Sequence, residues 1–166
     1  MIVETEAYCG ELDKACHTYG GRTTERTSVL YYPPGTAYVY QIYGMYFCLN
    51  AVTQKEGVGE AVLIRACEPV EGLELMRKNR TSRRTGRQPE KKNLTSGPGK
   101  LCQAMGITTR YNKSSFISGV LQIHDNRTVK KQHIRSAERI GVDYAEEARE
   151  FPYRFYIQDN AFVSHT

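Results

Sequence analysis

The stretch YVYQIYGMYFCLN, residues 38–50, carries the clearest structural signal in this sequence. Apolar side chains alternate on either side of Tyr43 and Gly44, a pattern typical of two β-strands joined by a tight turn. Gly44 provides the backbone freedom that such a turn needs. The segment therefore predicts a β-hairpin with Tyr43 at its tip.

An aromatic ring at a hairpin tip is exposed to water unless it buries against a partner. Proteins that kink duplex DNA insert side chains of this kind between base steps, and this chain has a formal net charge of +5. Tyr43 is therefore a candidate DNA wedge. Hydrophobic packing within the protein is the alternative, since aromatic residues are ordinary strand formers.

The length of the chain, 166 residues, is enough for one domain with its own core. Its longest apolar stretch is interrupted at Gln41, Gly44 and Asn50, and it falls short of the roughly 20 residues needed to cross a bilayer. The amino terminus, MIVETEAY, carries two glutamates where a signal peptide has a basic and then an apolar region. We expect no membrane span and a location at the nucleoid in the cytoplasm, or in the nucleus of a eukaryote.

Five cysteines, at positions 9, 16, 48, 67 and 102, form no C-x-x-C pair. An odd set of this kind favours neither a disulfide framework nor a zinc ribbon, and it fits a reducing compartment. Cys9, Cys16 and His17 match no usual zinc spacing and have no evident fourth ligand. We therefore expect these residues to be structural and the protein to hold no metal.

The positive charge is concentrated in one segment. Between Arg77 and Lys92, eight Lys or Arg residues accompany one acid, Glu90, so this segment carries +7 and the rest of the chain −2. Its Thr, Ser, Gly and Pro residues predict a flexible basic loop over residues 81–92, after a short helix. Such a loop is suited to phosphate contacts, and a solvated linker is the alternative.

The remaining pattern predicts a mixed fold. Strands outnumber helices and are joined mostly by short links, which favours a single α+β domain. We expect a mostly antiparallel, curved β-sheet with peripheral helices and a protruding β-hairpin. The expected strands are 2–8, 37–42, 45–52, 61–67, 120–124 and 154–157, and the expected helices are 11–17, 71–80, 99–105 and 144–150.

The first predicted strand carries the candidate chemistry, because Glu4, Glu6 and Tyr8 share one of its faces. Two carboxylates on a partly buried strand are costly unless they are partnered or used. Cleavage of a sugar–base bond needs a carboxylate that deprotonates water and stabilises an oxocarbenium-like transition state. A solvent-facing edge strand is the alternative, and the spacing does not separate Glu4 from Glu6.

Six segments in order carry a recognisable pattern and cover nearly the whole chain. They are IVETEAY (2–8), the H-x-x-G-G-R run (17–22), PGTAYVYQIYGMYFCLN (34–50), VLIRACEPVEGLE (62–74), SGPGKLCQA (96–104) and RFYI (154–157). Together they closely resemble the alkyladenine (3-methyladenine) DNA glycosylase family. The resemblance implies a monofunctional repair enzyme without a cofactor, and we expect a monomer. Such an enzyme flips alkylated or deaminated purines out of duplex DNA and hydrolyses the N-glycosidic bond, leaving an abasic site.

The resemblance also assigns roles around the flipped base. It makes Glu6 the general base and Arg65 the residue that helps hold the attacking water. It places the extruded base between Tyr8, Tyr40 and His17. It makes Asn50 the residue that crowds the exocyclic amino group of normal guanine. The pocket residues implied in this way are Tyr8, His17, Tyr40, Asn50 and Ile140.

Contacts with the rest of the DNA are implied at further positions. The wedge of the family, which fills the gap left in the duplex, matches Tyr43. The other DNA-binding positions implied by the resemblance are Arg22, Thr24, Met45, Lys100 and Gly141.

The chain departs from the family pattern at its amino terminus. Family members normally have several tens of residues, including a helix and a strand, before the E-T-E-A-Y run, whereas Glu6 is the sixth residue here. We expect this amino-terminal part of the family fold to be absent, with more effect on stability than on chemistry.

Two other classes of function compete with a glycosylase. A non-catalytic nucleic-acid binding module would use the basic loop and the hairpin and would leave damaged DNA intact. A carbohydrate or free-nucleoside hydrolase would use Glu4 and Glu6 as a carboxylate pair. Their place on one strand argues against such a pair, because glycosidase carboxylates usually flank the scissile bond from opposite sides.

Overall fold

The predicted hairpin is present in the computed structural model, which describes residues 1–164. Strands β2 (Ala37–Ile42) and β3 (Tyr46–Val52) pair antiparallel and are joined by a turn. Tyr43 and Gly44 have φ angles of 49° and 68°, the two positive values that the twist of a hairpin favours. The sequence-based expectation is thus confirmed, with β3 starting one residue later than predicted.

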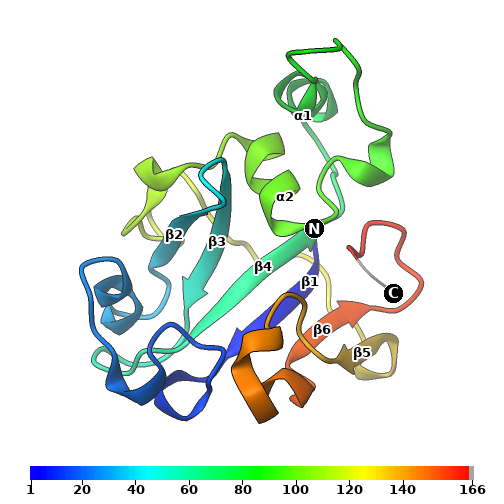
Figure 1. The fold of residues 1–166 in the computed structure, drawn as a ribbon. Helices are drawn as coiled ribbons and strands as arrows, with labels where there is room; N and C mark the ends of the chain where they lie inside the picture. Colours follow the sequence, from blue (N-terminus) through cyan, green and yellow to red (C-terminus); the bar gives the residue numbers. More distant parts are fainter. Residues whose placement is uncertain (165–166) are drawn as a thin grey trace.

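The hairpin forms one side of an antiparallel sheet, which has six strands within the described residues (Figure 1). The order is β2-β3-β4-β1-β6-β5. The strands outside the hairpin are β1 (Ile2–Tyr8), β4 (Ala61–Cys67), β5 (Ile134–Ala137) and β6 (Arg154–Ile157). β1 pairs with both β4 and β6. The alternative of a solvent-facing edge strand is therefore wrong for β1, and its polar face is covered.

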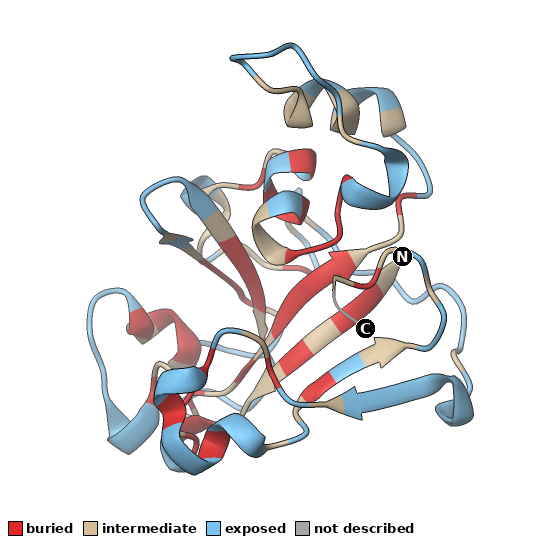
Figure 2. Ribbon diagram, turned by 45° about the vertical axis from the view of Figure 1, so that its right-hand side comes forward, coloured by how far each residue is buried: buried red, intermediate tan, exposed pale blue. Residues whose placement is uncertain are grey.

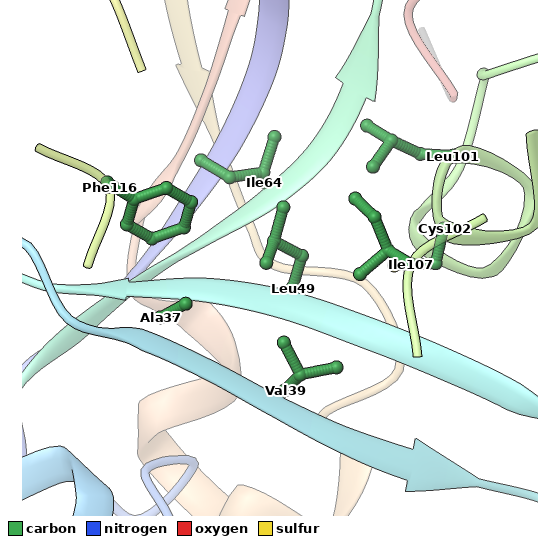
Figure 3. Packing of buried hydrophobic residues seen from close by; sticks show 8 residues of the cluster. All are labelled: Ala37, Val39, Leu49, Ile64, Leu101, Cys102, Ile107 and Phe116. Carbon is green, nitrogen blue, oxygen red and sulfur yellow. The ribbon is translucent and has the colours of Figure 1, made fainter. Parts of the chain in front are cut away.

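The main core lies between the sheet and helix α2 (Pro98–Met105). Val39, Leu49 and Ile64 pack there against Leu101 and other side chains (Figure 3). Successive strand residues point to opposite faces, so Tyr40, Asn50 and Arg65, each next to a core residue in sequence, lie on the other face. The packing of this core thereby fixes which side chains face the opposite side of the sheet.

The opposite face of the sheet is covered by loops and short 3₁₀-helices instead of long helices. A second cluster there contains Ala15, Val142, Ala145 and Ala148, with Tyr8 packed against it. The 3₁₀-helices of the described chain are η1 (Gly10–Leu12), η2 (Tyr19–Gly21), η3 (Thr27–Tyr31), η4 (Lys91–Asn93), η5 (Thr109–Tyr111), η6 (Lys131–His133) and η7 (Asp143–Glu150). Loops rather than regular elements therefore complete this side of the molecule.

Helix α1 (Leu73–Arg80) and the basic segment lie beside α2, on its side away from the hairpin (Figure 1). Residues 81–90 contain no helix or strand, and the loop is closed by a hydrogen bond from the Ser82 N–H to the Arg87 carbonyl, 3.0 Å. This segment is largely exposed (Figure 2). No helix of the described residues is long and apolar enough to span a bilayer.

One predicted helix is wrong and another is present as a 3₁₀-helix. Over 11–17 only the turn η1 forms, because the Asp13 carboxylate accepts the N–H groups of Cys9 and Ala15 at 3.0 Å each, a local alternative to helical bonding. Over 144–150 the chain forms the 3₁₀-helix η7, which is interrupted at Glu146, with φ 48° and ψ −125°. The helices predicted at 71–80 and 99–105 form with starts at residues 73 and 98.

The strand predicted at 120–124 is also wrong, and a different strand is present. Val120 is 92% exposed and Leu121 packs against the main core, but no strand of the described residues pairs with this segment. Strand β5 instead forms at Ile134–Ala137 by pairing with β6. Its side chains are mostly exposed, which left no apolar pattern to predict it from.

Candidate functional site

A cavity of about 340 Å³ opens on the face of the sheet opposite α2. Its size is typical of a site for a small ligand or a single base. The sheet supplies its floor and the loops on that face supply its rim. The residues that line it include Tyr8, His17, Tyr38, Tyr40, Asn50, Leu63, Arg65, Pro98, Ile140, Gly141 and Tyr144.

Glu6 lies directly behind this lining and is completely buried. Its Oε2 accepts a hydrogen bond from the Tyr8 hydroxyl, 2.9 Å, and its Oε1 accepts the N–H of Ile140, 2.8 Å. Arg65 Nη1 is 3.3 Å from the same Oε1. All three partners line the cavity. The Glu6 carboxylate is therefore oriented by residues that a ligand in the cavity would contact.

Glu4 has a different environment, although it lies on the same face of β1. Its Oε1 accepts from Arg154 Nε at 2.7 Å and from Arg65 Nε at 3.3 Å, and its Oε2 accepts the N–H of Ser164 at 2.6 Å. Burial alone would raise the pKa of Glu4, but the hydrogen bonds from Ser164 and Arg154 and the charge of Arg65 hold it below its ordinary value. Glu4 is thus a partner that is charged at neutral pH and anchors Arg65.

Arg65 joins the two carboxylates and is only 6% exposed. One end of its guanidinium contacts Glu4 and the other contacts Glu6. A buried arginine held in this way costs little further ordering when a ligand arrives. The structure therefore brings Arg65 beside Glu6, as the resemblance implied.

Aromatic rings form one wall of the cavity. The rings of Tyr38 and Tyr40 stack with centroids 5.1 Å apart, and the edge of His17 meets Tyr40 at 4.8 Å. His17 Nδ1 and the Tyr38 hydroxyl are hydrogen-bonded at 2.9 Å. Tyr40 and His17 were both expected in the pocket, whereas Tyr38 was missed, although its two-residue spacing from Tyr40 put both on one strand face.

The wall is uncharged at neutral pH. Burial, assisted by the nearby charge of Arg26, lowers the pKa of His17 to about 4. Burial also raises the pKa of Tyr8 and of Tyr40. The side chains therefore offer ring faces and neutral hydrogen-bonding groups to a ligand.

Asn50 and Ile140 both reach the cavity, as expected. Asn50 is 4% exposed, and its Nδ2 donates to the carbonyl of Tyr38 at 3.1 Å across the hairpin. Gly141 also lines the cavity, with a φ of 77° that favours glycine. Asn50 is thus fixed by the strand opposite it.

The proposed DNA contacts are exposed, and only part of them border the cavity. Tyr43 lines its rim and is 87% exposed, and Met45 beside it is 66% exposed. Arg22, Thr24 and Lys100 are exposed and do not line the cavity. The structure thus places Tyr43 at the rim of the cavity and leaves Arg22, Thr24 and Lys100 on the outer surface.

Besides Tyr38, three more residues near the site were missed by sequence reasoning. Tyr144 lines the cavity, and its hydroxyl donates to the Ala15 carbonyl at 3.3 Å. Asp13 and Arg139 form a buried ion pair behind the site. Isolated charges 126 residues apart give no local signal, and only their proximity in the fold makes them a pair.

Cys9, Cys16 and His17 do not gather around a common point. Cys16 Sγ instead lies 3.1 Å from the Thr18 hydroxyl. Within residues 1–164, no group of three or more His, Cys, Asp or Glu side chains is placed to hold a metal ion.

Comparison with known proteins identifies similar sequences. A family model described as Methylpurine-DNA glycosylase (MPG) matches residues 1–161. A Clostridium perfringens (strain 13 / Type A) protein is 52% identical over 98% of this chain and 82% of its own length. Proteins of Clostridium tetani (52%, 98% and 81%) and Bacillus cereus strain G9842 (48%, 99% and 82%) are similar to the same extent. All three relatives bear the name "Putative 3-methyladenine DNA glycosylase".

Proposed function

The chain belongs to the methylpurine-DNA glycosylase family, and from this membership we propose that it removes alkylated purines, 3-methyladenine among them, from duplex DNA. The observation that carries the proposal is the completely buried Glu6 behind an aromatic cavity. A carboxylate held by Tyr8 and Ile140 is suited to act on a water molecule beside a bound base.

The proposed reaction is hydrolysis at the anomeric carbon. Glu6 takes a proton from water, the water oxygen bonds to the anomeric carbon, and the N-glycosidic bond breaks with its electron pair leaving on the base. The charge of Glu6 favours the positive charge that develops on the sugar. Arg65 holds the water beside Glu6. The products are a free base and an abasic site.

The target nucleotide must leave the helix before this reaction. Extrusion costs a few kcal/mol and costs least for damaged or poorly paired bases. We propose that the base then lies between Tyr8, Tyr40 and His17, while Tyr43 fills the gap in the duplex. Alkylated purines that carry a positive charge are further attracted to the ring faces of the wall.

Selection against normal guanine is proposed to depend on Asn50. Its amide is fixed by the Tyr38 carbonyl and so cannot move aside for the exocyclic amino group of guanine. Hypoxanthine lacks that group and is therefore a second proposed substrate.

We propose that water, and not an amine, is the nucleophile. The residues that line the cavity in the described chain include no lysine. Borohydride treatment during turnover should therefore trap no covalent protein–DNA adduct. Within residues 1–164, one chain supplies the Tyr8, Ile140 and Arg65 contacts of Glu6, which supports a monomer. We further propose that it acts on DNA in the cytoplasm.

The basic segment, residues 77–92, is proposed to contact phosphates beside the site. It packs next to α2, whose first residue, Pro98, lines the cavity. Five of its exposed cations have no ion-pair partner among residues 1–164, namely Lys78, Arg83, Arg84, Arg87 and Lys91. Unpaired, exposed cations of this kind suit the phosphate backbone of a duplex.

Base release by Glu6→Gln tests the proposal. The variant keeps the volume of the side chain but lacks the basic carboxylate, so it should bind duplexes containing a lesion with parental affinity and release no base. Glu11→Gln, a change at an exposed glutamate, is the matched control and should keep the parental rate. Undiminished release by Glu6→Gln would refute the role of Glu6.

The competing functions give different outcomes in the same assay. A non-catalytic binding module would leave lesion-containing DNA intact even with the parental chain. A free-nucleoside hydrolase would cleave nucleosides in the absence of DNA. Duplexes containing 3-methyladenine or hypoxanthine, assayed beside the free nucleosides, separate the three.

A further inference from the structure

A buried ion pair joins two loops behind the cavity. Arg139 Nη2 donates to Oδ1 of Asp13 at 2.8 Å, and its Nη1 donates to Oδ2, so the two planar groups bind each other through two hydrogen bonds. Asp13 is 2% exposed and Arg139 is 5% exposed. The pair therefore holds the loop that contains Arg139 against the segment that follows β1.

The other hydrogen bonds of this pair reach the backbone on both sides. Burial alone would raise the pKa of Asp13, but the bonds from Arg139 and from backbone N–H groups hold it below its ordinary value. Asp13 therefore stays ionised in the folded protein. The backbone partners are the N–H groups of Cys9 and Ala15, which donate to Asp13, and the carbonyls of Ala7 and Ala148, which accept from Arg139.

Two short routes lead from Arg139 to Glu6. Along the chain, the next residue is Ile140, whose N–H donates to Glu6 Oε1 at 2.8 Å. Through space, the guanidinium lies over the ring of Tyr8, 4.8 Å from its centroid, and the Tyr8 hydroxyl donates to Glu6 Oε2 at 2.9 Å. Each oxygen of Glu6 therefore has a donor whose position depends on Arg139.

The pair acts on the site only through these neighbours. Neither Asp13 nor Arg139 lines the cavity. A buried ion pair is also weak evidence of stabilisation, because well-packed apolar residues often replace such a pair without loss. Two hydrogen bonds in a fixed plane do, however, define an orientation, and catalytic groups must be held to within about 0.5 Å.

We propose that Asp13 and Arg139 are positioning residues, which set the orientation of the Glu6 carboxylate toward the attacking water. This inference rests on the proposed function, in which Glu6 is the general base. It assigns to the pair an effect on the rate of base release and none on the affinity for DNA.

Two variants separate positioning from folding. The double variant Asp13→Leu/Arg139→Met removes both charges and retains apolar volume, and Arg139→Lys keeps the charge without the two-bond geometry. For both we expect a single-turnover rate of base release about 10- to 100-fold below the parental rate, since misplacement by about 1 Å can cost 10²-fold. The dissociation constant for a lesion-containing duplex should change less than about twofold. Arg139→Lys should lose less activity than the double variant.

Lys14→Met is the matched control. Lys14 follows Asp13 directly and pairs with Glu146 and Glu147 of η7 at 2.6 and 2.8 Å, so it ties the same two segments together without reaching Glu6. This variant should keep the parental rate.

The outcomes distinguish this inference from the proposed function. If Glu6→Gln, run in parallel, releases base at the parental rate, the proposed function itself fails. If Glu6→Gln is inactive and a folded double variant releases base at the parental rate, only the positioning role is overturned. Loss of DNA affinity in step with rate, or failure of both pair variants to fold, would assign the pair to the fold and also overturn it.

Discussion

The Tyr8 hydroxyl donates a hydrogen bond to Oε2 of Glu6, 2.9 Å away and two residues earlier on the same strand. Both side chains leave β1 on one face, and Tyr8 also lines the cavity. Burial, with the charge of Glu6 as the next cause, raises the pKa of Tyr8. The hydroxyl therefore stays protonated and able to donate. A residue in the wall of the pocket thus also orients Glu6, the proposed general base.

Tyr8→Phe should slow base release while preserving the ring that is proposed to contact the flipped base. Hydrogen bonds to charged groups contribute about 1.5–3 kcal/mol, which corresponds to a single-turnover rate about 10- to 100-fold lower. Tyr31→Phe is the control, because the Tyr31 hydroxyl bonds the Arg22 carbonyl at 3.3 Å outside the cavity. Equal rates for both variants would show that this hydroxyl does not orient Glu6.

Tyr43→Ser should impair extrusion of the base and leave the pocket intact. With the proposed wedge removed, we expect base release from a well-paired lesion to fall about tenfold, because the cost of unstacking is no longer offset. The same lesion in a mismatch should be affected less, since its extrusion costs less. Tyr43→Phe, which keeps the ring, should behave like the parent. An equal loss on both duplexes would contradict the insertion role.

His17 should make the folded state sensitive to mild acid. Its pKa is lowered from 6.5 to about 4 by burial and by Arg26, so the unfolded chain takes up a proton at a pH where the folded protein does not. Stability is then lost as the pH falls from 6.5 toward about 4. Thermal melting of His17→Asn should show a shallower decline over this window. Parallel decline in parent and variant would exclude the contribution of His17.

Arg83→Ser/Arg84→Ser should reduce the salt dependence of DNA binding. Each phosphate contact contributes about 0.9 to the slope of log K against log salt, so loss of two contacts should lower the slope by about 1.8. Lys130→Ser/Lys131→Ser removes the same charge from an exposed segment elsewhere and should have a smaller effect. Slopes measured by titration of duplex DNA at several salt concentrations decide between a DNA contact and a solvated linker.

The strands were the most predictable part of the fold. β1, β2, β4 and β6 have the bounds that their alternation indicated, because one face of each meets a packed surface. Pattern reasoning failed where tertiary contacts decide local structure. The turn at η1 depends on Asp13, whose partner Arg139 lies 126 residues away, and β5 exists because β6 lies beside it.

The candidate site was predictable only in part. Periodicity placed Glu4 and Glu6 on one face, and the family resemblance selected Glu6. Their difference is a property of the folded state, since Glu4 is occupied by Arg154, Arg65 and Ser164 whereas Glu6 is held by groups that line the cavity. Those partners come from distant parts of the chain, and no window of sequence contains them.

The backbone of Tyr43 has one more consequence. With a φ of 49° it adopts a left-handed conformation that suits asparagine better than a bulky residue. Redesign of this turn for heat resistance would select a small polar residue at position 43. The resulting hairpin would be more stable but would lack an aromatic side chain at its tip. We therefore expect thermostability to favour a small polar residue at position 43, and the proposed insertion into DNA to favour tyrosine.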